Sequence, residues 1–356
     1  MSRVDVRELV ELLSRGELSQ QAVEELLARA PLLDLGFARL DTGRGARQGV
    51  PEAVLAEGKS PQQVAAIVAA LLEGGSETIL VTRAGHEVRA ADLTRPNWDR
   101  PDPGEPADYW QADLTDAGAV YALVRGCEIV VHTAAIPQPV HNPPHVVFGN
   151  NLLSTFNVLE AAIAWGVQRL VNFSSETVPG FIFAHRPYRP DYLPIDEEHP
   201  IRPQDPYATA KWFGELLCDR AVERADLRCT SIRPCWVQDE GSYERNLGPI
   251  VRDPSVLIEN YCSYVDVYDL CDAVLLAIET DLPGHEVFYV ASPDTIGGHP
   301  LVETVERYYG AEGIEFRPLE RPDASAISSA KAERLLGWTP RRSWRDYLDE
   351  HGRRRA

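Results

Sequence analysis

Strand-like apolar runs alternate with helical segments from residue 77 onward, and this alternation constrains the fold of the 356-residue chain more than any other feature. Such alternation is typical of βαβ units, in which helices cover both faces of a parallel sheet. The candidate strands are residues 79–81, 88–91, 129–132, 170–173 and 230–233. The candidate helices are residues 117–125, 152–165 and 207–224. We therefore predict an α/β protein built on a parallel sheet.

Residues before 77 follow a different, helical pattern. The best-marked helix there has Ser60 as its N-cap, Pro61 at its first position and the pair Gly74-Gly75 as its stop. Between these signals one face is apolar, formed by Val64, Ile67, Val68, Leu71 and Leu72. The sequence thus predicts a helical N-terminal extension in front of the α/β part.

The charge of the chain argues against two classes of partner. Lysine and arginine number 35 against 54 aspartates and glutamates, and the net charge of −19 repels nucleic-acid phosphates and anionic membrane surfaces. There is no apolar run of about 18 residues and no apolar signal region at the start, so we expect a cytoplasmic protein. The six cysteines form no C-x-x-C pair, which favours reduced thiols over a disulfide framework or a zinc site.

Two clusters of ionisable residues are weak candidates for chemistry. His141 and His145 are four residues apart, but Pro143 and Pro144 between them disfavour a helix that aims both imidazoles at one metal ion. We therefore expect no metal site. The carboxylates of residues 196–198 lie in a proline-flanked loop, and we expect them to form a solvated edge of a cleft.

The most informative motif is Y-A-T-A-K at residues 207–211. Positions i and i+4 share one face of a helix, so the Tyr207 phenol and the Lys211 ammonium project together. A tyrosine that works as an acid or base near neutral pH needs its pKa lowered by about 3 units, and a neighbouring cation contributes to that. The chain has only three lysines, which gives the position of Lys211 weight.

Further motifs lie at matching distances along the chain. S-S-E-T-V-P-G at residues 174–180 follows an apolar strand, where open α/β sheets bind ligands. H-T-A-A at 132–135, the segment 151–162, R-P at 233–234, Y-V-D-V-Y-D at 264–269 and K-A-E-R-L-L-G-W-T-P at 331–340 complete the pattern. In order and spacing, residues 85–348 resemble the extended short-chain dehydrogenase/reductases. More narrowly, they are similar to the NAD-dependent epimerase/dehydratase family, which implies a Rossmann-like fold.

The resemblance implies a catalytic trio. Tyr207 is expected to be the acid/base, Lys211 to lower its pKa and bind the nicotinamide ribose, and Ser175 to hydrogen-bond the reacting substrate oxygen. Hydride would pass from a sugar-like or nucleotide-sugar hydroxyl to the nicotinamide while Tyr207 removes the hydroxyl proton. We leave open whether the chain forms a homodimer.

The resemblance also implies cofactor contacts. Asp92 matches the carboxylate that binds the adenosine ribose, which favours NAD over NADP because a 2′-phosphate would meet like charge. Asp113 and Leu114 match the pair at the adenine edge. The remaining implied contacts are Ala134, Ala135, Asn151 and Pro234.

A second resemblance covers residues 5–84. D-L-G-F-A-R-L-D at 34–41, R-x-x-R-Q-G-x-P-E at 44–52 and E-G-K-S-P at 57–61 are its specific elements. They look like the N-terminal region of the pyridinium-3,5-biscarboxylic acid mononucleotide synthases, which act in nickel-pincer cofactor synthesis. Nothing after Ala84 resembles the carboxylase-like domain of that family, so its activity is not carried over.

The joint between the two resemblances lacks a feature that the cofactor needs. Family members begin with a strand, a G-x-x-G-x-x-G turn and a helix that holds the pyrophosphate. Here only residues 83–86 separate the first strand-like run from the next, too few for a parallel crossover. A gene fusion with an internal deletion accounts for this joint. Loss of two or three charge-assisted hydrogen bonds would weaken cofactor binding by about two to six orders of magnitude.

These observations give three regions and three functional hypotheses. We predict an N-terminal region at 1–84, an epimerase/dehydratase-like domain at 85–348 whose substrate part is mainly 181–206 and 243–320, and a tail at 349–356. The first hypothesis is an NAD-dependent epimerase, dehydratase or sugar dehydrogenase. The alternatives are a catalytically silent remnant or binding module with a crippled cofactor site and, more weakly, a role in nickel-pincer cofactor synthesis.

Overall fold

The computed structural model describes residues 32–34, 39–41, 89–93, 108–186, 188–256 and 258–355. The chain forms two compact units, one of residues 1–90 and 94–109 and one of residues 91–93 and 110–356. In the first unit the described residues form two short antiparallel strands, β1 (Leu32–Asp34) and β2 (Arg39–Asp41). The predicted N-terminal helices, the strand at 79–81 and the predicted joint at 84–85 lie outside the described residues.

The remaining elements follow in chain order. The strands are β3 (Arg89–Asp92), β4 (Asp108–Gln111), β5 (Ile129–His132), β6 (Arg169–Phe173), β7 (Tyr192–Leu193), β8 (Arg228–Pro234), β9 (Val237–Gln238), β10 (Val265–Asp266), β11 (His285–Val290) and β12 (Glu315–Phe316). The helices are α5 (Ala117–Val124), α6 (Pro144–Trp165), α7 (Pro206–Arg224), α8 (Gly248–Arg252), α9 (Val267–Glu279), α10 (Leu301–Thr304), α11 (Ala330–Leu336) and α12 (Trp344–Tyr347). Short helical turns occupy Tyr243–Leu247, Ile296–Gly298 and Val305–Tyr309.

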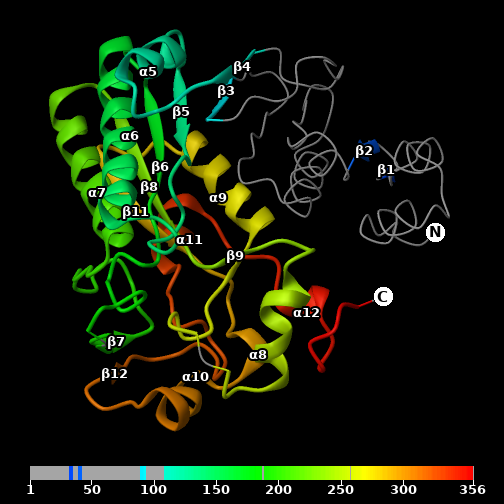
Figure 1. Cartoon of the computed structure of the whole chain (residues 1–356). Helices are drawn as coiled ribbons and strands as arrows, with labels where there is room; N and C mark the ends of the chain where they lie inside the picture. Colours follow the sequence, from blue (N-terminus) through cyan, green and yellow to red (C-terminus); the bar gives the residue numbers. More distant parts are fainter. Residues whose placement is uncertain are drawn as a thin grey trace. The chain divides into compact units, whose positions relative to one another are not determined.

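A four-stranded parallel sheet in the order β11-β8-β6-β5 is the centre of the second unit. Figure 1 shows α5, α6 and α7 along one face of this sheet, while α9 and α11 contact its other face. Because the strands are parallel, their carboxyl ends meet at one edge, where the loops after β5, β6 and β8 lie together. The predicted α/β class with helices on both faces is confirmed.

The strands β3 and β4 form a separate two-stranded sheet. In the classic doubly wound order 3-2-1-4-5-6, the first strand joins strands 2 and 3 to strand 4. Among the described strands, none pairs with the edge of β5 that faces away from β6. The loop after β4 is nevertheless anchored to α6, because Asn157 Nδ2 donates to the Leu114 carbonyl at 2.9 Å. Among the described strands, β5 is therefore the edge of the four-stranded sheet.

Helix α6 begins earlier than the sequence predicted. Pro143 is its N-cap and Pro144 its first residue, which is where proline is well tolerated because that N–H lacks a helical partner. The prediction of a start at residue 152 was therefore wrong by about two turns. The helix ends at Gly166, whose φ of 70° is left-handed. By length and composition α6 could cross a membrane, but half of its most apolar window is buried, and it packs between α5 and α7.

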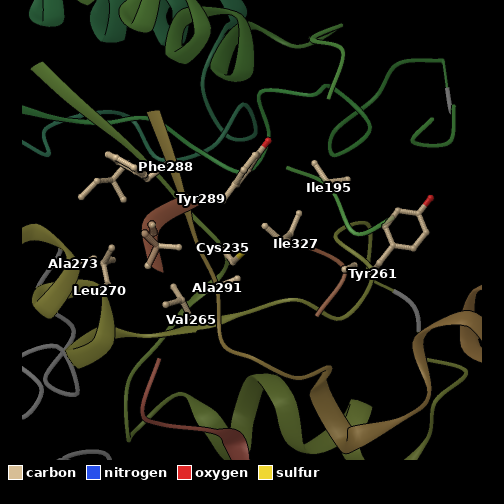
Figure 2. Packing of buried hydrophobic residues seen from close by; sticks show 14 of the residues in the cluster. Ile195, Cys235, Tyr261, Val265, Leu270, Ala273, Phe288, Tyr289, Ala291 and Ile327 are labelled. Carbon is tan, nitrogen blue, oxygen red and sulfur yellow. The ribbon is translucent and has the colours of Figure 1, made fainter. Parts of the chain in front are cut away.

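A hydrophobic cluster joins the sheet to a smaller lobe at one end of it. Figure 2 shows Phe288 and Tyr289 of β11 in the same cluster as Ile195 and Ile327, which come from loop segments far apart in the sequence. The lobe contains β7, β12, α8 and α10, with β12 parallel to β7 (Figure 1). The predicted substrate segments, 181–206 and 243–320, contribute these elements. The lobe and the sheet therefore share one core.

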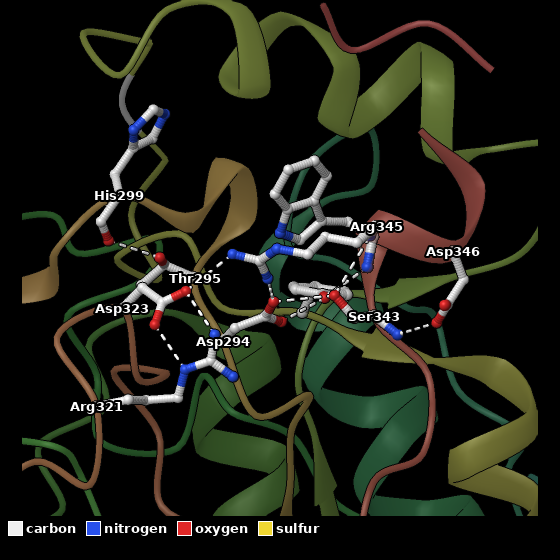
Figure 3. A network of polar contacts seen from close by, with 10 residues as sticks. Asp294, Thr295, His299, Arg321, Asp323, Ser343, Arg345 and Asp346 are labelled. Atoms are coloured by element: carbon white, nitrogen blue, oxygen red, sulfur yellow. Dashed lines mark hydrogen bonds and ion pairs between the residues drawn. The ribbon is translucent and has the colours of Figure 1, made fainter. Parts of the chain in front are cut away.

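Ion pairs fasten the end of the chain to this lobe. Asp294, which is 1% exposed, accepts hydrogen bonds from Tyr264, Ser343 and Arg345. Asp323 bridges Arg345 to Arg321 (Figure 3). A buried carboxylate is stable only when such donors surround it. The network thus holds the C-terminal segment in place beside the lobe.

Candidate active site

The loop after β6 carries the first group of the site. Ser174 N donates to the Ile232 carbonyl at 2.8 Å and Glu176 N to the Pro234 carbonyl at 3.2 Å, so the loop continues along β8 before it turns. The turn ends at Gly180, where φ is +96° and an added Cβ would lie 2.1 Å from the Arg202 carbonyl oxygen. Only glycine fits there. The loop therefore holds the residues between 174 and 180 in one conformation.

The start of α7 carries the second group. The Asp205 side chain caps the helix by accepting from Tyr207 N at 2.8 Å and Ala208 N at 2.9 Å, and Pro206 occupies the first turn. An aspartate cap followed by proline is a strong helix start signal. It places the phenol of Tyr207 in the first turn of α7, next to the loop after β6.

The structure brings together the three residues predicted to be catalytic. Ser175 lies close enough to the Tyr207 phenol to lower its pKa. The Lys211 ammonium lies 5.8 Å from the centroid of the Tyr207 ring and donates to the Phe173 carbonyl at 2.6 Å. Ser175 and Tyr207 are 6% and 8% exposed, so both are close to fully buried. Their predicted roles remain predictions.

Burial is the largest influence on the pKa values of Tyr207 and Lys211. Burial raises the pKa of Tyr207 to about 12; Ser175 lowers it, and the nearby carboxylates Glu176 and Asp205 raise it. Burial also lowers the pKa of Lys211 to about 8, against the attraction of Glu215. At neutral pH the phenol is therefore protonated and the lysine is still mostly cationic.

A neutral histidine lies at the end of β5. Burial, and then the charge of Lys211, lower the pKa of His132 to about 3. His132 Nε2 lies 3.1 Å from Thr155 Oγ1, which itself donates to the Asn151 carbonyl. Because the threonine proton is used, the His132 Nε2 atom is the donor and Nδ1 is left as an acceptor. Sequence reasoning included His132 only as part of a motif.

A buried ion pair lies next to Lys211 along α7, and the sequence analysis did not identify it. Glu215, one turn beyond Lys211, binds Arg233 of β8 through two contacts of 2.7 Å, and both side chains are at most 4% exposed. Ser174 Oγ donates to the same carboxylate at 2.5 Å. The signal available in the sequence was the spacing of Tyr207, Lys211 and Glu215 at i, i+4 and i+8 on one helix.

Two other clusters do not form sites. Asp219, His285 and Ser231 are hydrogen-bonded at 2.7 and 2.8 Å in the manner of a hydrolase triad, but Ser231 is fully buried and cannot reach a substrate. No cluster suited to a metal ion occurs among the described residues, and His141, with φ of 69°, precedes α6 while His145 lies within it. The prediction that the two prolines disfavour a helix was therefore wrong, because Pro144 is the first residue of α6.

The predicted solvated edge at residues 196–198 also needs correction. Glu197 accepts a hydrogen bond from Tyr289 N at 2.7 Å, and burial raises its pKa. Asp196 accepts from Tyr192 and Arg317 at 2.5 and 2.8 Å. These two carboxylates tie the loop to β11 and to β7, and only Glu198 is exposed. The groups that hydrogen-bond these two carboxylates, a backbone N–H and an arginine, lie far along the chain, so local composition could not predict that the carboxylates are tied down.

Comparison with known proteins agrees with this geometry. The profile of the NAD dependent epimerase/dehydratase family matches residues 65–291, which is more than half of the chain. The chain belongs to that family. A second profile, described as the LarB/PurE-like N-terminal domain, matches residues 32–95. Both resemblances inferred from the sequence are therefore confirmed, and the two matches overlap over residues 65–95, around the predicted joint.

Individual relatives are distant. UDP-glucose 4-epimerase 2 of Arabidopsis thaliana is 28% identical over 311 residues, which cover 75% of this chain and 85% of that protein. A uronate dehydrogenase of Pseudomonas putida is 28% identical over 180 residues, 51% of this chain and 59% of its own length. A solved structure described as MoeE5 in complex with UDP-glucuronic acid and NAD superposes with a TM-score of 0.53 at 20% identity, over 83% of this chain and 95% of that one. The last likeness establishes the fold alone.

The residues of this epimerase/dehydratase family member fit the nicotinamide half of the cofactor. Asn151 holds the loop after β5, because its Oδ1 accepts from Ile136 N at 2.7 Å and its Nδ2 donates to the Ile136 carbonyl at 2.9 Å. The preceding pair, Ala134 and Ala135, is exposed or partly exposed, so small side chains leave this edge open. Together with Tyr207 and Lys211, this edge offers a lysine donor and an uncrowded surface, the chemistry a ribose needs. Pro234 ends β8 beside the loop after β6, where its carbonyl accepts from Glu176 N.

Of the residues predicted for the adenosine half, Asp92 lies on the two-stranded sheet, and Asp113 and Leu114 follow it. Asp92 ends β3, and its carbonyl accepts from Ala112 N at 2.9 Å, which brings it near Asp113. The Asp113 carboxylate accepts from the side chain and backbone of Thr115 at 2.7 and 2.8 Å, and these hydrogen bonds lower its pKa. Leu114 follows at the contact with α6. The predicted pyrophosphate region, residues 79–88, lies outside the described residues.

Proposed function

We propose that the chain is an NAD-dependent epimerase, dehydratase or dehydrogenase that oxidises a hydroxyl group of a sugar or nucleotide sugar. The observation that carries the proposal is the assembly of Ser175, Tyr207 and Lys211 at the carboxyl end of the parallel sheet. The family description supports a nicotinamide cofactor. The names of the relatives, UDP-glucose 4-epimerase and uronate dehydrogenase, support a sugar-type substrate.

In this proposal Tyr207 and Lys211 divide the work at the reacting hydroxyl. Bound NAD supplies the acceptor for the hydride. Once ionised, the phenolate of Tyr207 takes the hydroxyl proton in the oxidation, and the phenol returns it in the reverse step. Lys211 holds the ribose through ammonium protons that the Phe173 carbonyl leaves free, since an ammonium has three donors. The carboxylate of Asp92 favours NAD over NADP, and Asp113, Leu114, Ala134, Ala135, Asn151 and Pro234 remain the proposed lining of the cofactor site.

A second candidate is a catalytically silent binding module. One observation favours it: the Tyr207 pKa of about 12, far above neutral pH. The sequence-based prediction that the pyrophosphate turn is missing supports it too. Without a pyrophosphate turn, the positive cofactor that would help to ionise Tyr207 binds too weakly. A role of the N-terminal region in nickel-pincer cofactor synthesis stays a weaker alternative.

Calorimetric titration with NAD and NADH separates the two candidates. Micromolar binding is expected if the chain is an enzyme, followed by NADH formation when UDP-glucose, UDP-glucuronate or a free uronate is added. Binding that is absent or millimolar, in a protein with a folded far-UV spectrum, would sink the enzyme proposal. The same titration with NADP tests whether Asp92 excludes a 2′-phosphate.

Tyr207→Phe is the matching test of the site. It removes the phenolic oxygen and keeps the ring, so turnover is expected to fall by about 100-fold or more, the usual worth of a general acid/base, without loss of fold. Tyr121→Phe on α5 is the control, because that ring is partly buried away from the loop after β6. Wild-type turnover in Tyr207→Phe would refute the role of Tyr207.

A homodimer remains a proposal. Two apolar side chains on α6, Leu153 and Phe156, are 44% and 43% exposed although they lie one turn apart on a long helix. Exposed apolar side chains that cluster on one helix face favour a protein contact. No nucleic acid or membrane partner is proposed, because the net charge of −19 disfavours both.

A further inference from the structure

Asn260 carries a buried acceptor atom that no other group of the protein satisfies. Its Oδ1 is one of four buried side-chain polar atoms without a hydrogen-bond partner among the described residues. Such an atom is unfavourable, and native structures contain few of them. Asn260 is 6% exposed, the same fraction as Ser175, so the two residues are equally accessible. The unsatisfied acceptor therefore belongs to a residue at the depth of the site.

The other half of the Asn260 amide fixes its orientation. Nδ2 donates to the Ser263 carbonyl at 2.8 Å and to the two carboxyl oxygens of Glu176 at 3.2 and 3.3 Å. An amide NH₂ group has two protons, so one serves Ser263 and the other is shared by the Glu176 oxygens. A flipped amide would place Oδ1 against the Ser263 carbonyl, which is itself only an acceptor. Oδ1 therefore cannot exchange places with Nδ2 to find a donor.

The turn that carries Asn260 has an unfavourable backbone conformation. Ser263 N donates to the Asn260 carbonyl at 3.2 Å, and the two residues between them, Tyr261 and Cys262, have φ of 54° and 62°. Turns with positive φ at both central positions normally use glycine, asparagine or aspartate there. Bulkier residues keep such angles only where the surrounding structure holds them, and these places cluster at functional sites. The turn is thus a second, independent indication of function at Asn260.

Packing holds this turn beside the loop after β6. The Tyr261 ring lies in the hydrophobic cluster that joins the sheet to the lobe (Figure 2), and it meets the Phe181 ring edge-on with centroids 5.8 Å apart. On the polar side, the Asn260 amide bonds Glu176, which directly follows Ser175 in the chain. Asn260 therefore contacts the immediate neighbour of the residue predicted to bond the reacting oxygen.

A second unsatisfied atom near the trio is also an acceptor. Asp205 uses Oδ1 to accept from Tyr207 N, and its Oδ2 has no partner. A carboxylate or phosphate of a ligand only accepts hydrogen bonds, so it cannot satisfy Asn260 Oδ1 or Asp205 Oδ2. A hydroxyl group can, because it brings a proton. The chemistry on this side of the site therefore favours a hydroxyl of the ligand.

We propose that Asn260 is a substrate-binding residue whose Oδ1 accepts a hydrogen bond from a sugar hydroxyl. This rests on the proposed function, which makes the ligand a sugar or nucleotide sugar, and it names the group that binds at this point as a hydroxyl and not a carboxylate or phosphate. Because Oδ1 bonds no other group in the protein, the incoming hydroxyl breaks no existing protein hydrogen bond there. The new hydrogen bond therefore contributes to affinity with little offset.

Calorimetric binding of UDP-glucose and of its 2-, 3-, 4- and 6-deoxy analogues tests the proposal without cofactor or turnover. Asn260→Leu has a similar shape and no acceptor, and it is expected to bind UDP-glucose about tenfold more weakly, since one such hydrogen bond is worth about a decade of affinity. In the wild type, one deoxy analogue should show a loss of the same size. Asn260→Leu should bind that analogue no more weakly than the wild type does, because the bond is already absent.

Asn246→Leu is the matched control. It makes the same substitution at an amide whose Oδ1 and Nδ2 are both bonded within the protein, to Arg245 and Gln238. It should leave the affinities for UDP-glucose and for every analogue unchanged. Near-ultraviolet spectra establish that each variant is folded. Asn260→Ala, which also removes the acceptor, takes the place of Asn260→Leu if the leucine variant does not fold.

The outcomes separate this proposal from the proposed function. If no deoxy analogue couples to Asn260, or if the wild type does not bind UDP-glucose, the role of Asn260 is overturned. If UDP-glucose binds with the expected coupling but NAD does not bind, the enzyme proposal fails and the role of Asn260 stands. If the protein forms NADH from a sugar and no hydroxyl couples to Asn260, the enzyme proposal stands and the role of Asn260 fails.

Discussion

Burial, more than any neighbouring charge, determines which groups around Ser175 carry a charge. It is the largest influence on the pKa of Tyr207, Lys211, His132 and Glu176, and in each case it favours the uncharged form. Glu176 is the clearest case, since burial raises its pKa to about 8 although Asn260 Nδ2 and the Cys235 thiol donate to it. At neutral pH Glu176 is mostly a neutral acid, and of these four residues Lys211 alone is mostly charged.

The neutral state of Glu176 predicts a pH dependence of stability. The unfolded carboxyl ionises near 4.5 and the folded one near 8, so the folded state holds the proton more tightly. The contribution to stability is complete below about pH 4.5 and is lost as the pH rises to 8. Glu176→Gln removes this loss. Relative to the wild type, its free energy of unfolding should therefore rise across that window by about 1 kcal/mol per pH unit.

Urea denaturation of both proteins at pH 5, 6, 7 and 8 (about one unit apart, to follow the linkage slope) checks this. Glu198→Gln is the matched control, because it makes the same substitution at an exposed glutamate. A constant difference between Glu176→Gln and the wild type over these pH values would mean that Glu176 is already ionised in the folded protein.

At the scale of elements, one helix row organises the site. Three residues of α7, each four apart, lie against three consecutive residues at the end of β6 and just after it: Tyr207 beside Ser175, Lys211 with the Phe173 carbonyl, and Glu215 with Ser174. The pairing of Tyr207 with Lys211 was predictable, because it depends on helix geometry alone. The partner of Glu215 was not, because Arg233 lies on β8 and only the folded sheet brings it beneath α7.

The same distinction holds for the elements themselves. Strands β5, β6 and β8 and helices α5 and α7 were predicted within two residues at each end, because each has an apolar period and clear stop signals. The start of α6 was missed because a Pro-Pro pair was taken as a helix breaker, whereas Pro144 stands in the first turn. Strands β7 and β12 pair across more than 100 residues, and two-residue strands have no period to read.

The Glu215–Arg233 pair predicts an asymmetry between single and double replacement. Arg233→Met leaves the Glu215 carboxylate buried without its cation, which should cost about 3 to 5 kcal/mol of unfolding free energy. Adding Glu215→Gln removes the uncompensated charge and keeps an acceptor for Ser174. The double variant should then be more stable than Arg233→Met alone. Chemical denaturation of the two variants at neutral pH measures this, and a double variant that is as unstable as the sum of its parts would contradict it.

At the scale of the whole molecule, the matches to the two families overlap over residues 65–95. Among the described strands, β3 pairs with β4 in one sheet and β5 pairs with β6 in another. The prediction that the first βα unit is missing rests on the four residues between the strand-like runs, and because these lie outside the described residues it stays a prediction. Contacts within the lobe such as Arg317 with Asp196 join residues 121 positions apart, which no local pattern shows.

If the first βα unit is missing as the sequence predicts, supplying it should raise the affinity for the cofactor. The expected change is an insertion between Ala84 and Gly85 of a strand, a G-x-x-G-x-x-G turn and a helix, with the rest of the chain unchanged. The turn would offer backbone N–H groups to the pyrophosphate at a helix N-terminus. Calorimetry should then show NAD binding tighter than in the original chain by about 100-fold or more, since two or three charge-assisted hydrogen bonds are regained. The control is the same insertion with valine at the three glycine positions of the turn, where side chains keep the backbone away from a phosphate. Equal affinity in all three proteins, each with a folded far-UV spectrum, would mean that this chain holds its cofactor without such a turn.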